Sequence, residues 1–277
     1  MNKYYTRACN FYYGSHAKLL IKKRLALPLC GSKNIAFDKV EIFNRKKNSI
    51  TSRTVSIKNI KKFKGLIKEK IQKDLKKIIQ KRKNFLKNTN FLEPSIMGIL
   101  NVTPDSFSDG GKFYKKKNAE SHIHQMIKDG AKIIDIGGES TRPGSTTVKV
   151  KYELERVEKI IKNFKKRNKK ICLSIDTRKS EVMIRAIKHG ANLINDVSGF
   201  NYDQESLSKL KKFDIAKVLH HMKGTPNTMQ KNPKYKNVLL DIYDFFENGI
   251  KKIDNNKIII DPGIGFGKNL KHNLTLI

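Results

Sequence analysis

Six short apolar runs, each followed by polar or glycine-rich residues, constrain the fold of this 277-residue chain most strongly. Stretches with helical periodicity separate them, such as SEVMIRAIKHG at 180–190, which closes on a glycine. Continuous apolar strands that alternate with helices predict a parallel sheet that is buried on both faces. The runs are IMGILNVT (96–103), KIIDIGGEST (132–141), ICLSIDT (171–177), LINDVSG (193–199), AKVLHHM (216–222) and KIIIDPGIGFGK (257–268).

The polar residues after every run distinguish between two architectures that a parallel sheet can form. In a doubly wound sheet the strands at the switch point carry the functional residues, whereas a (β/α) barrel gathers all its strand ends around one mouth. The pattern therefore favours an α/β fold of the (β/α)8 TIM-barrel type. A closed barrel needs eight strands and about 250 residues, but residues 94–277 supply six βα units in 184 residues. We therefore expect either a truncated barrel or one whose missing quarter comes from elsewhere.

The residues before this region differ from it in charge. The chain carries a net charge of +34, and residues 1–90 hold 25 Lys and Arg against 4 Asp and Glu. Residues 62–86 space apolar side chains by three, four and seven among lysines, which predicts an amphipathic helix with a basic outer face. FDKVEIF and SRTVSI alternate enough for short strands. We divide the chain into a basic N-terminal extension, 1–93, and a barrel domain, 94–277.

The charge alone does not identify a partner. Aromatic residues are not interleaved with it in an RNA-binding pattern, so we expect no specific nucleic-acid partner. A chain rich in Lys, Asn and Ile is typical of an AT-biased genome. Weak attraction to polyanions or membrane surfaces and an organelle transit peptide are the alternatives.

No apolar run reaches the roughly 18 residues of a membrane span. Three scattered cysteines fit reduced thiols, so we expect a cytoplasmic protein.

Three strand-end residues, Asp176, Asn195 and Asp261, form the first candidate site. Buried carboxylates and an amide that converge on a pocket need partners, because an unpaired charge in a low dielectric is costly. A heterocycle with adjacent N–H and NH2 donors would satisfy them through bidentate hydrogen bonds. The alternative is that some of these groups cap loops or neighbouring helices.

A second group follows the first two strands. ESTRPG (139–144) places Ser140, Thr141 and Arg142 in a strand-to-helix loop, which fits a phosphate or pyrophosphate. Asn101 ends the neighbouring strand. One or two protein oxygens there, with phosphate oxygens and water, would hold Mg2+.

Six long motifs occur in the order and spacing of the dihydropteroate synthase family, and the chain resembles that family over about residues 94–277. They are NVTPDSFSDGG, DIGGESTRPGS, SIDTRKSEV, NDVSG, HMKGTPNTMQ and DPGIGFGK. The resemblance implies a TIM-barrel transferase of folate biosynthesis. It would condense 4-aminobenzoate with 6-hydroxymethyl-7,8-dihydropterin pyrophosphate and release pyrophosphate, with Mg2+ as cofactor and a homodimer as the common assembly.

The resemblance also implies roles for single residues. Asp176, Asn195 and Asp261 look like pterin-pocket residues, and Asn101 resembles the residue that meets the metal–pyrophosphate. The predicted catalytic residues are Asn101, Arg142, Asp176 and Asp261, with Asn101 also at the metal. The predicted substrate-binding residues are Thr141 on the anion and aminobenzoate side, Asn195, Met222, the pocket aromatic Phe266, the neighbouring base Lys268, and Asp105 and Asp109, which flank Phe107 in a mobile first loop.

Two departures from the family pattern matter. His220-His221-Met222 stands where the family usually shows Met-His-Met, and adjacent histidines on a strand point to opposite faces, so they are no metal signal. The Ser-Arg-Lys and Arg-x-His segments of the family's last two strands are absent, and an open barrel exposes two hydrophobic edges. We therefore expect this chain alone to be poorly folded or inactive, unless it is part of a longer protein. An inactive truncated fragment that retains a pterin pocket is the alternative, followed by a pterin-binding methyltransferase domain.

Overall fold

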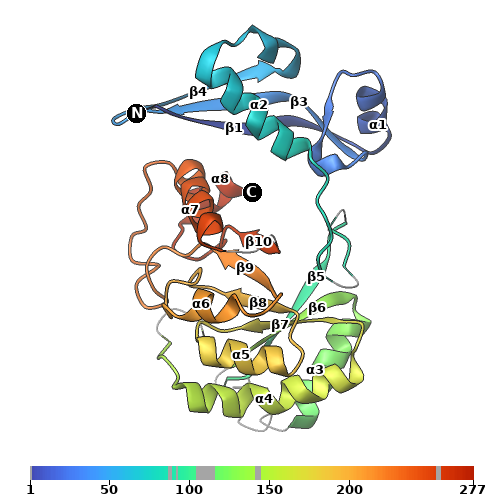
Figure 1. Cartoon of the computed structure of the whole chain (residues 1–277), viewed down its shortest axis with the longest axis vertical. Helices are drawn as coiled ribbons and strands as arrows, with labels where there is room; N and C mark the ends of the chain where they lie inside the picture. Colours follow the sequence, from blue (N-terminus) through green and yellow to red (C-terminus); the bar gives the residue numbers. More distant parts are fainter. Residues whose placement is uncertain (1, 87–88, 92, 104–115, 141–144, 254–256) are drawn as a thin grey trace. The chain divides into compact units, whose positions relative to one another are not determined.

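The computed structural model of the chain describes residues 2–86, 89–91, 93–103, 116–140, 145–253 and 257–277. It divides into two compact units, each with its own core. The first comprises Met1–Lys83 and Phe91–Glu93, and the second comprises Asn84–Asn90 and Pro94–Ile277. Figure 1 labels the elements of both units.

The first unit is built on an antiparallel sheet of four strands. The central strand β3 pairs with β1 along its whole length, from Tyr13↔Ile35 to Lys3↔Arg45. The short strand β2 pairs with the start of β3, and β4 pairs with its second half. The elements in chain order are β1 (Lys3–Tyr13), α1 (Gly14–Lys22), β2 (Leu27–Pro28), η1 (Leu29–Gly31), β3 (Ile35–Arg45), β4 (Ile50–Ser56), η2 (Ile57–Lys62) and α2 (Gly65–Ile79).

Helix α2 is the amphipathic helix that the lysine-rich pattern predicts, but it is shorter than the expected 62–86. Residues 57–62 form the 3-10 helix η2 instead, and Gln80 is extended, which ends α2. Leu86, assigned to the helix by its spacing, is buried in the second unit. Ile71 of α2 is fully buried with Phe37, Val40 and Ile42 of β3. The apolar stripe of α2 therefore covers the sheet of its own unit.

The second unit contains all six strands expected from the apolar runs, in one parallel sheet of order β10-β9-β8-β7-β6-β5. Each strand precedes a helix, and the α/β barrel-type fold is thereby confirmed with six βα units. The elements are β5 (Ile96–Asn101), α3 (Lys116–Lys128), β6 (Ala131–Gly137), α4 (Val150–Arg167), β7 (Cys172–Asp176), α5 (Ser180–Lys188), β8 (Leu193–Asp196), α6 (Ser206–Leu210), β9 (Ala216–His220), α7 (Val238–Lys252), β10 (Ile258–Asp261) and α8 (Leu270–Leu276).

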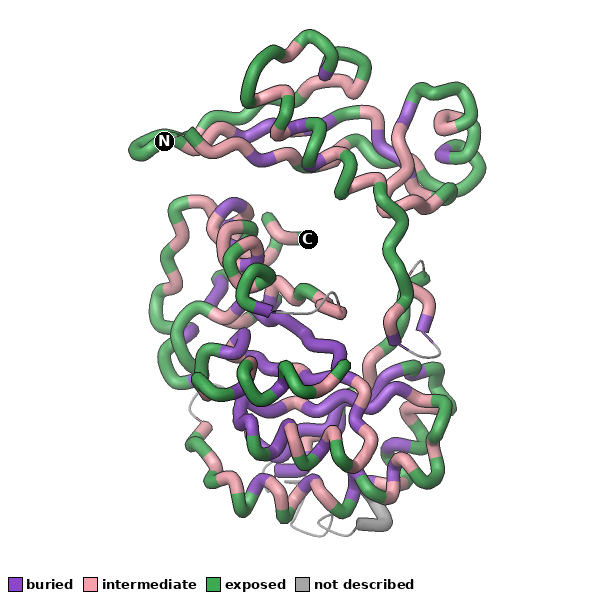
Figure 2. Tube along the Cα trace, viewed as in Figure 1, coloured by how far each residue is buried: buried purple, intermediate pink, exposed green. Residues whose placement is uncertain are grey.

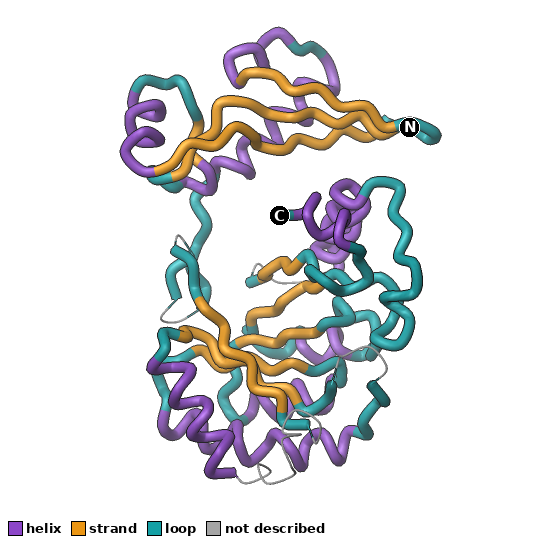
Figure 3. Tube along the Cα trace, turned by 180° about the vertical axis from the view of Figure 1, so that it is seen from behind, coloured by secondary structure: helices purple, strands orange, loops and turns teal. Residues whose placement is uncertain are grey.

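The main core of this unit lies between the sheet and its helices. Ile134, Leu173 and Ile194 from successive strands are fully buried, and Ile161 and Met183 cover them from α4 and α5. Figure 2 shows that the strands are the most buried part of the unit, and Figure 3 shows the helices along the outside of the curved sheet. At about 25 cal/mol per Å2, apolar burial of this kind dominates the stability of the unit.

The sheet ends in two edge strands, β5 and β10. Ile96 and Ile99 of β5 are 62% and 59% exposed, and Ile260 of β10 is 53% exposed. Each edge therefore offers apolar side chains and unpaired backbone groups to a further strand. In the described part of the chain, no helix combines the length and the hydropathy that a membrane crossing requires.

Candidate pterin site at the strand ends

Four residues at the carboxyl ends of adjacent strands share one register line. Asn101 of β5 pairs with Gly137 of β6, Gly137 pairs with Asp176 of β7, and Asp176 pairs with Asn195 of β8. Because side chains alternate along a strand, residues in register point to the same face of a parallel sheet. The sheet therefore brings together three of the predicted site residues.

Gly137 determines how closely these groups approach one another. A Cβ atom at this position would lie 3.3 Å from Oδ2 of Asp176 and 3.4 Å from Oδ1 of Asn101. Such contacts are tighter than those of most side chains, so a larger residue here would push the two polar groups away. Strand β6 thus contributes only backbone at this level, and Asn101 and Asp176 converge across it.

Asp135 lies one step below this line and was missed from the sequence. It is two residues before Gly137 on β6, on the same face, and only 3% of it is exposed. The side-chain amide of Asn195 donates a hydrogen bond from Nδ2 to Oδ2 of Asp135, with a length of 2.9 Å. The signal was an aspartate inside the apolar run KIIDIGG, since a buried carboxylate requires a partner.

The floor of this site is rich in acceptors. Burial raises the pKa of Asp135, and burial together with the neighbouring carboxylates of Asp135 and Asp196 raises the pKa of Asp176 well above its ordinary value. Among the described residues, Oδ1 of Asp135 and Oδ1 of Asn195 are buried without a hydrogen-bond partner. A ligand that brings N–H donors would satisfy these groups, whereas an anionic ligand would not.

Asp261 approaches from the last strand of the sheet. It pairs with His220, two residues beyond the Val218 that pairs with Asn195. The amide of Gly263 donates to Oδ1 of Asp261 over 2.7 Å. This hydrogen bond orients the carboxylate at the carboxyl end of β10. Asp261 therefore lies at the same end of the sheet as Asp176 and Asn195, although none of the described contacts joins it to them directly.

Lys268 holds the loop after Asp261 in shape. Its ammonium donates to the carbonyls of Gly263 and Phe266 over 2.8 and 2.9 Å and lies 3.0 Å from Nδ1 of His221. Burial lowers the pKa of Lys268 to about 8. Lys268, the predicted base, therefore holds the GIGFG turn through hydrogen bonds to its carbonyl groups. Its lowered pKa brings its titration close to neutral pH.

The two histidines point apart, as expected for neighbours on a strand. His220 places Nδ1 2.9 Å from the carbonyl of Val197 and packs its ring edge-to-face on Phe266, at 4.7 Å between centroids. His221 packs instead on Phe245, at 4.8 Å. Met222 is half-buried, and none of the described contacts places it with the strand-end groups.

A buried ion-pair network supports the loops after β6 and β7, and the sequence reading missed it too. Nζ of Lys179 lies 3.0 Å from Oε1 of Glu139 and 2.5 Å from Oε2 of Glu153. Arg178 donates to the other oxygen of Glu139 over 2.8 Å, and the amide of Val148 donates to Oε1 over 2.9 Å. Burial opposes ionisation of Glu139, but the Val148 amide and the Lys179 ammonium lower its pKa overall. These contacts tie Glu139 and Val148 to each other and to the residues that follow β7.

Five residues of the sequence hypothesis, Asp105, Phe107, Asp109, Thr141 and Arg142, lie outside the described residues. Asn101 is described and half-buried. Within the described ranges no three His, Cys, Asp or Glu side chains gather closely enough to hold a metal ion.

Comparison with known proteins agrees with this geometry. Residues 97–277 match the family model described as pterin binding enzyme. The chain belongs to this family. Dihydropteroate synthase of Escherichia coli K12 is 43% identical over 189 residues, which cover 66% of each chain. The resemblance read from the motifs is thereby confirmed.

Solved structures of the family give the same result. Dihydropteroate synthase of Yersinia pestis, in a sulfonamide drug complex, matches with a TM-score of 0.64 and 42% identity, over 68% of this chain and 70% of that one. The Xanthomonas albilineans enzyme with 4-aminobenzoic acid matches with a TM-score of 0.59 and 39% identity, over 66% of each. The chain thus spans about two thirds of the length of these relatives, and the matched part holds the strand-end site.

Proposed function

We propose that the chain is a dihydropteroate synthase, which condenses 4-aminobenzoate with 6-hydroxymethyl-7,8-dihydropterin pyrophosphate and releases pyrophosphate. The observation that carries the proposal is the group of acceptors formed by the buried Asp135 and the half-buried Asp176 and Asn195, in which Oδ1 of Asp135 and Oδ1 of Asn195 have no partner among the described residues. A reduced pterin presents ring N–H and amino donors along one edge, and donors of this kind satisfy buried acceptors that have no partner among the described residues.

Each strand-end residue takes a defined role in this proposal. Asp176 and Asn195 hold the pterin from the floor, and Asp261 bonds its amino and ring N–H edge from β10. Phe266 contributes an apolar wall beside His220, which its ring contacts. Lys268 sits behind this wall and keeps the turn between Gly263 and Phe266 in place. Met222 is proposed as a further, minor contact.

The pyrophosphate side is assigned to the loops after β5 and β6. Thr141 and Arg142 would bind the anion, and Asp105 and Asp109 would close over the second substrate. As pyrophosphate leaves, Arg142 neutralises the charge that develops on it. The C–O bond breaks, and the electron-rich pterin ring delocalises the cation left at its methylene carbon. The arylamine nitrogen of 4-aminobenzoate then bonds to that carbon and releases one N–H proton to solvent. Positioning of the two substrates then supplies much of the rate.

Mg2+ fits the donor set at the end of β5. The amide oxygen of Asn101 is a hard donor, and it lies beside Gly137, as does Oδ2 of Asp176. Mg2+ is usually held by one or two protein oxygens together with phosphate oxygens and water, so the amide oxygen of Asn101 could be one such protein ligand. We propose that Asn101 holds this ion, which would assist pyrophosphate departure by charge neutralisation.

The remaining assignments follow from the same proposal. The partners are the two small-molecule substrates and a second copy of the chain in a homodimer, and the compartment is the cytoplasm. We also propose that residues 1–93 are a separate basic extension and that residues 94–277 are the barrel domain.

The proposal is tested by turnover of the purified chain with dihydropterin pyrophosphate, 4-aminobenzoate and Mg2+, with pyrophosphate release as the readout. Release that requires 4-aminobenzoate and is lost in Asp261→Ala supports a synthase. The matched control is Asp129→Ala, an exposed aspartate after α3. A folded chain that releases no pyrophosphate would contradict the activity and leave a pterin-binding fragment.

A further inference from the structure

The first unit carries an excess of positive charge that the rest of the chain does not share to the same degree. Residues 1–83 hold 24 Lys and Arg against 4 Asp and Glu, whereas residues 94–277 hold 34 against 20. A biased base composition of the gene would act on both parts alike, so it does not explain the difference. A charge of this density attracts polyanions.

The acids of this unit do little to neutralise it. Glu41 forms an ion pair with Arg7, and Asp74 forms one with Lys70, each at 2.6 Å. Asp38 accepts hydrogen bonds from two other side chains of the unit. Three of the four acids are therefore engaged within their own unit, and most of the cations are left in excess.

Half of these cations lie in residues 58–83, along η2, α2 and the segment after it. The three exposed lysines of α2 are spaced by three and four residues, which keeps them on one face of the helix. This lysine face consists of Lys73, Lys76 and Lys77. Residues 81–83, Lys-Arg-Lys, are exposed after the helix, and the acid Glu69 is exposed one turn before the lysine face.

The opposite face of α2 is already occupied. Ile71 is fully buried in the core of the unit, and Ile67 and Leu75 pack against that core. A helix that lies in a membrane surface must bury its apolar face among the lipids. In the folded unit α2 has no apolar face to offer a bilayer, so the lysine face favours a partner that it meets by charge alone.

The exposed side chains around the lysine face narrow the kind of partner further. All of 58–83 is described, and its exposed residues include no aromatic side chain and one large apolar one, Leu66. Protein interfaces are anchored by large aromatic or apolar side chains, and single-stranded nucleic acids stack their bases on aromatic rings. Contacts from lysine to the phosphates of a duplex need neither.

We propose that the lysine face of α2 binds the phosphate backbone of duplex nucleic acid without reading its base sequence. Helix α2 has 15 residues and is therefore about 22 Å long, which spans about six phosphates of one strand. The inference concerns the first unit alone, so it does not rest on the synthase activity proposed for the second.

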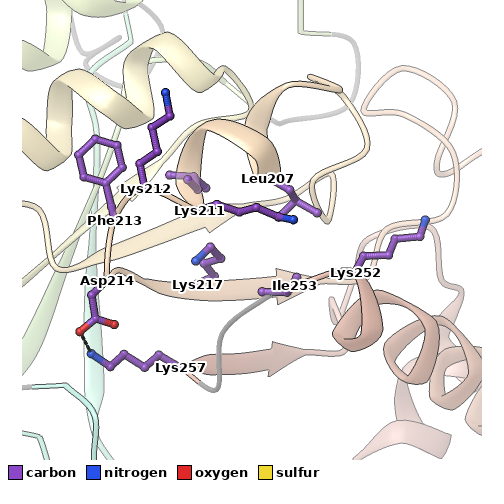
Figure 4. A pocket seen from close by; sticks show the side chains of 10 residues that line it. Leu207, Lys211, Lys212, Phe213, Asp214, Lys217, Lys252, Ile253 and Lys257 are labelled. Carbon is purple, nitrogen blue, oxygen red and sulfur yellow. Dashed lines mark hydrogen bonds and ion pairs between the residues drawn. The ribbon is translucent and has the colours of Figure 1, made fainter.

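The second unit supplies a matched control, because three of its exposed lysines come from different elements. Figure 4 shows Lys212 and Lys252 well apart at the cavity beside the starts of β9 and β10, with side chains that extend in different directions. Lys188 is exposed at the end of α5. Replacing these three by Gln removes as much charge as replacing the lysine face by Gln, but it leaves that face intact.

The test measures binding of a fluorescent DNA duplex of about 20 base pairs to the full chain by anisotropy, between about 50 and 200 mM salt. The logarithm of the association constant should fall linearly with the logarithm of the salt concentration. The combined change Lys73→Gln, Lys76→Gln and Lys77→Gln should reduce this slope by about 2.7, which is 0.9 for each lost phosphate contact. The control triple should keep the wild-type slope. Gln is a good helix former, so α2 should remain folded.

Equal slopes in the two triple variants would overturn the proposal, because the charge would then act without a defined face. A wild-type chain that binds no duplex over this salt range would overturn it as well. Polyglutamate and vesicles that contain phosphatidylserine serve as the other two arms. If the lysine-face variant loses binding to either of these and keeps its binding to the duplex, the face serves an acidic protein or a membrane instead, which also contradicts the proposal.

Discussion

Asn195 of β8 and Asp135 of β6 are joined by a hydrogen bond of 2.9 Å that passes across the intervening strand β7. Because Nδ2 of Asn195 donates to Asp135, the opposite atom of the amide, Oδ1, is left as a buried acceptor without a partner among the described residues. Asp135 therefore determines that Asn195 presents its Oδ1 atom, rather than its NH2 group, to the proposed pterin ligand. Asp135 acts as a positioning residue in this account.

Replacing Asp135 by alanine should weaken pterin binding by about tenfold, the effect of one lost hydrogen bond to a charged group. The amide of Asn195 would then be free to rotate and present its NH2 group to the ligand. Titration of 6-hydroxymethylpterin into the chain measures this effect. Asp129→Ala is the control, since Asp129 is exposed at the end of α3. Unchanged affinity in Asp135→Ala would remove its positioning role.

Asp176→Asn should stabilise the protein at neutral pH while it weakens pterin binding. The pKa of Asp176 is raised in the folded state, so the folded protein binds more protons than the unfolded chain above about pH 3.9. The free energy of unfolding therefore falls as the pH rises through this window, and asparagine removes that loss. We expect a gain in the free energy of unfolding at pH 7 that shrinks toward pH 4. Urea unfolding at both pH values measures it, and an equal difference at both would contradict the cause.

The buried network behind the loop 140–147 should be far more sensitive than a surface ion pair. Lys179→Met leaves Glu139 and Glu153 buried with one cation fewer, which costs about 3–5 kcal/mol. Lys209→Met breaks the exposed pair with Glu205 and should cost less than about 1 kcal/mol.

Chemical unfolding of the two lysine variants compares these costs directly. Adding Glu153→Gln to Lys179→Met should recover part of the loss, because it removes the unpaired buried charge. Similar losses in the Lys179 and Lys209 variants would show that the buried network contributes no more than the surface pair.

The division of the structure into two compact units predicts that residues 1–83 fold by themselves. Helix α2 and the sheet share a core centred on Ile71, Phe37 and Val40 that needs no residue of the second unit. The isolated segment should show a cooperative thermal transition by circular dichroism. Ile71→Ala should lower its stability by about 2–5 kcal/mol, the usual cost of truncating a buried isoleucine. A segment that unfolds without a transition would argue against an independent unit.

The sequence was most informative where an apolar run ends in a polar residue, because this pattern predicts both a strand and the position of its carboxyl end. Apolar runs that end in Asp176, Asn195 and Asp261 predicted both the strands and the edge at which these side chains emerge. Asp135 was missed because an aspartate inside KIIDIGG gives no sign of which partner will satisfy it. The network of Glu139, Lys179 and Glu153 joins segments from three different loops and helices, and such pairings depend on register and helix packing. The length of α2 was overestimated because Leu86 continues the apolar spacing of the helix, although the helix ends at Ile79.

The most direct test of the account is pterin binding by the full chain, with Asp261→Ala and Asp129→Ala measured beside it. Calorimetry with 6-hydroxymethylpterin should give one site per chain, with binding lost in Asp261→Ala and preserved in Asp129→Ala. The strand-end residues would then form a pterin pocket in this chain. A folded chain that binds no pterin, or that binds it equally well without Asp261, would contradict the central claim.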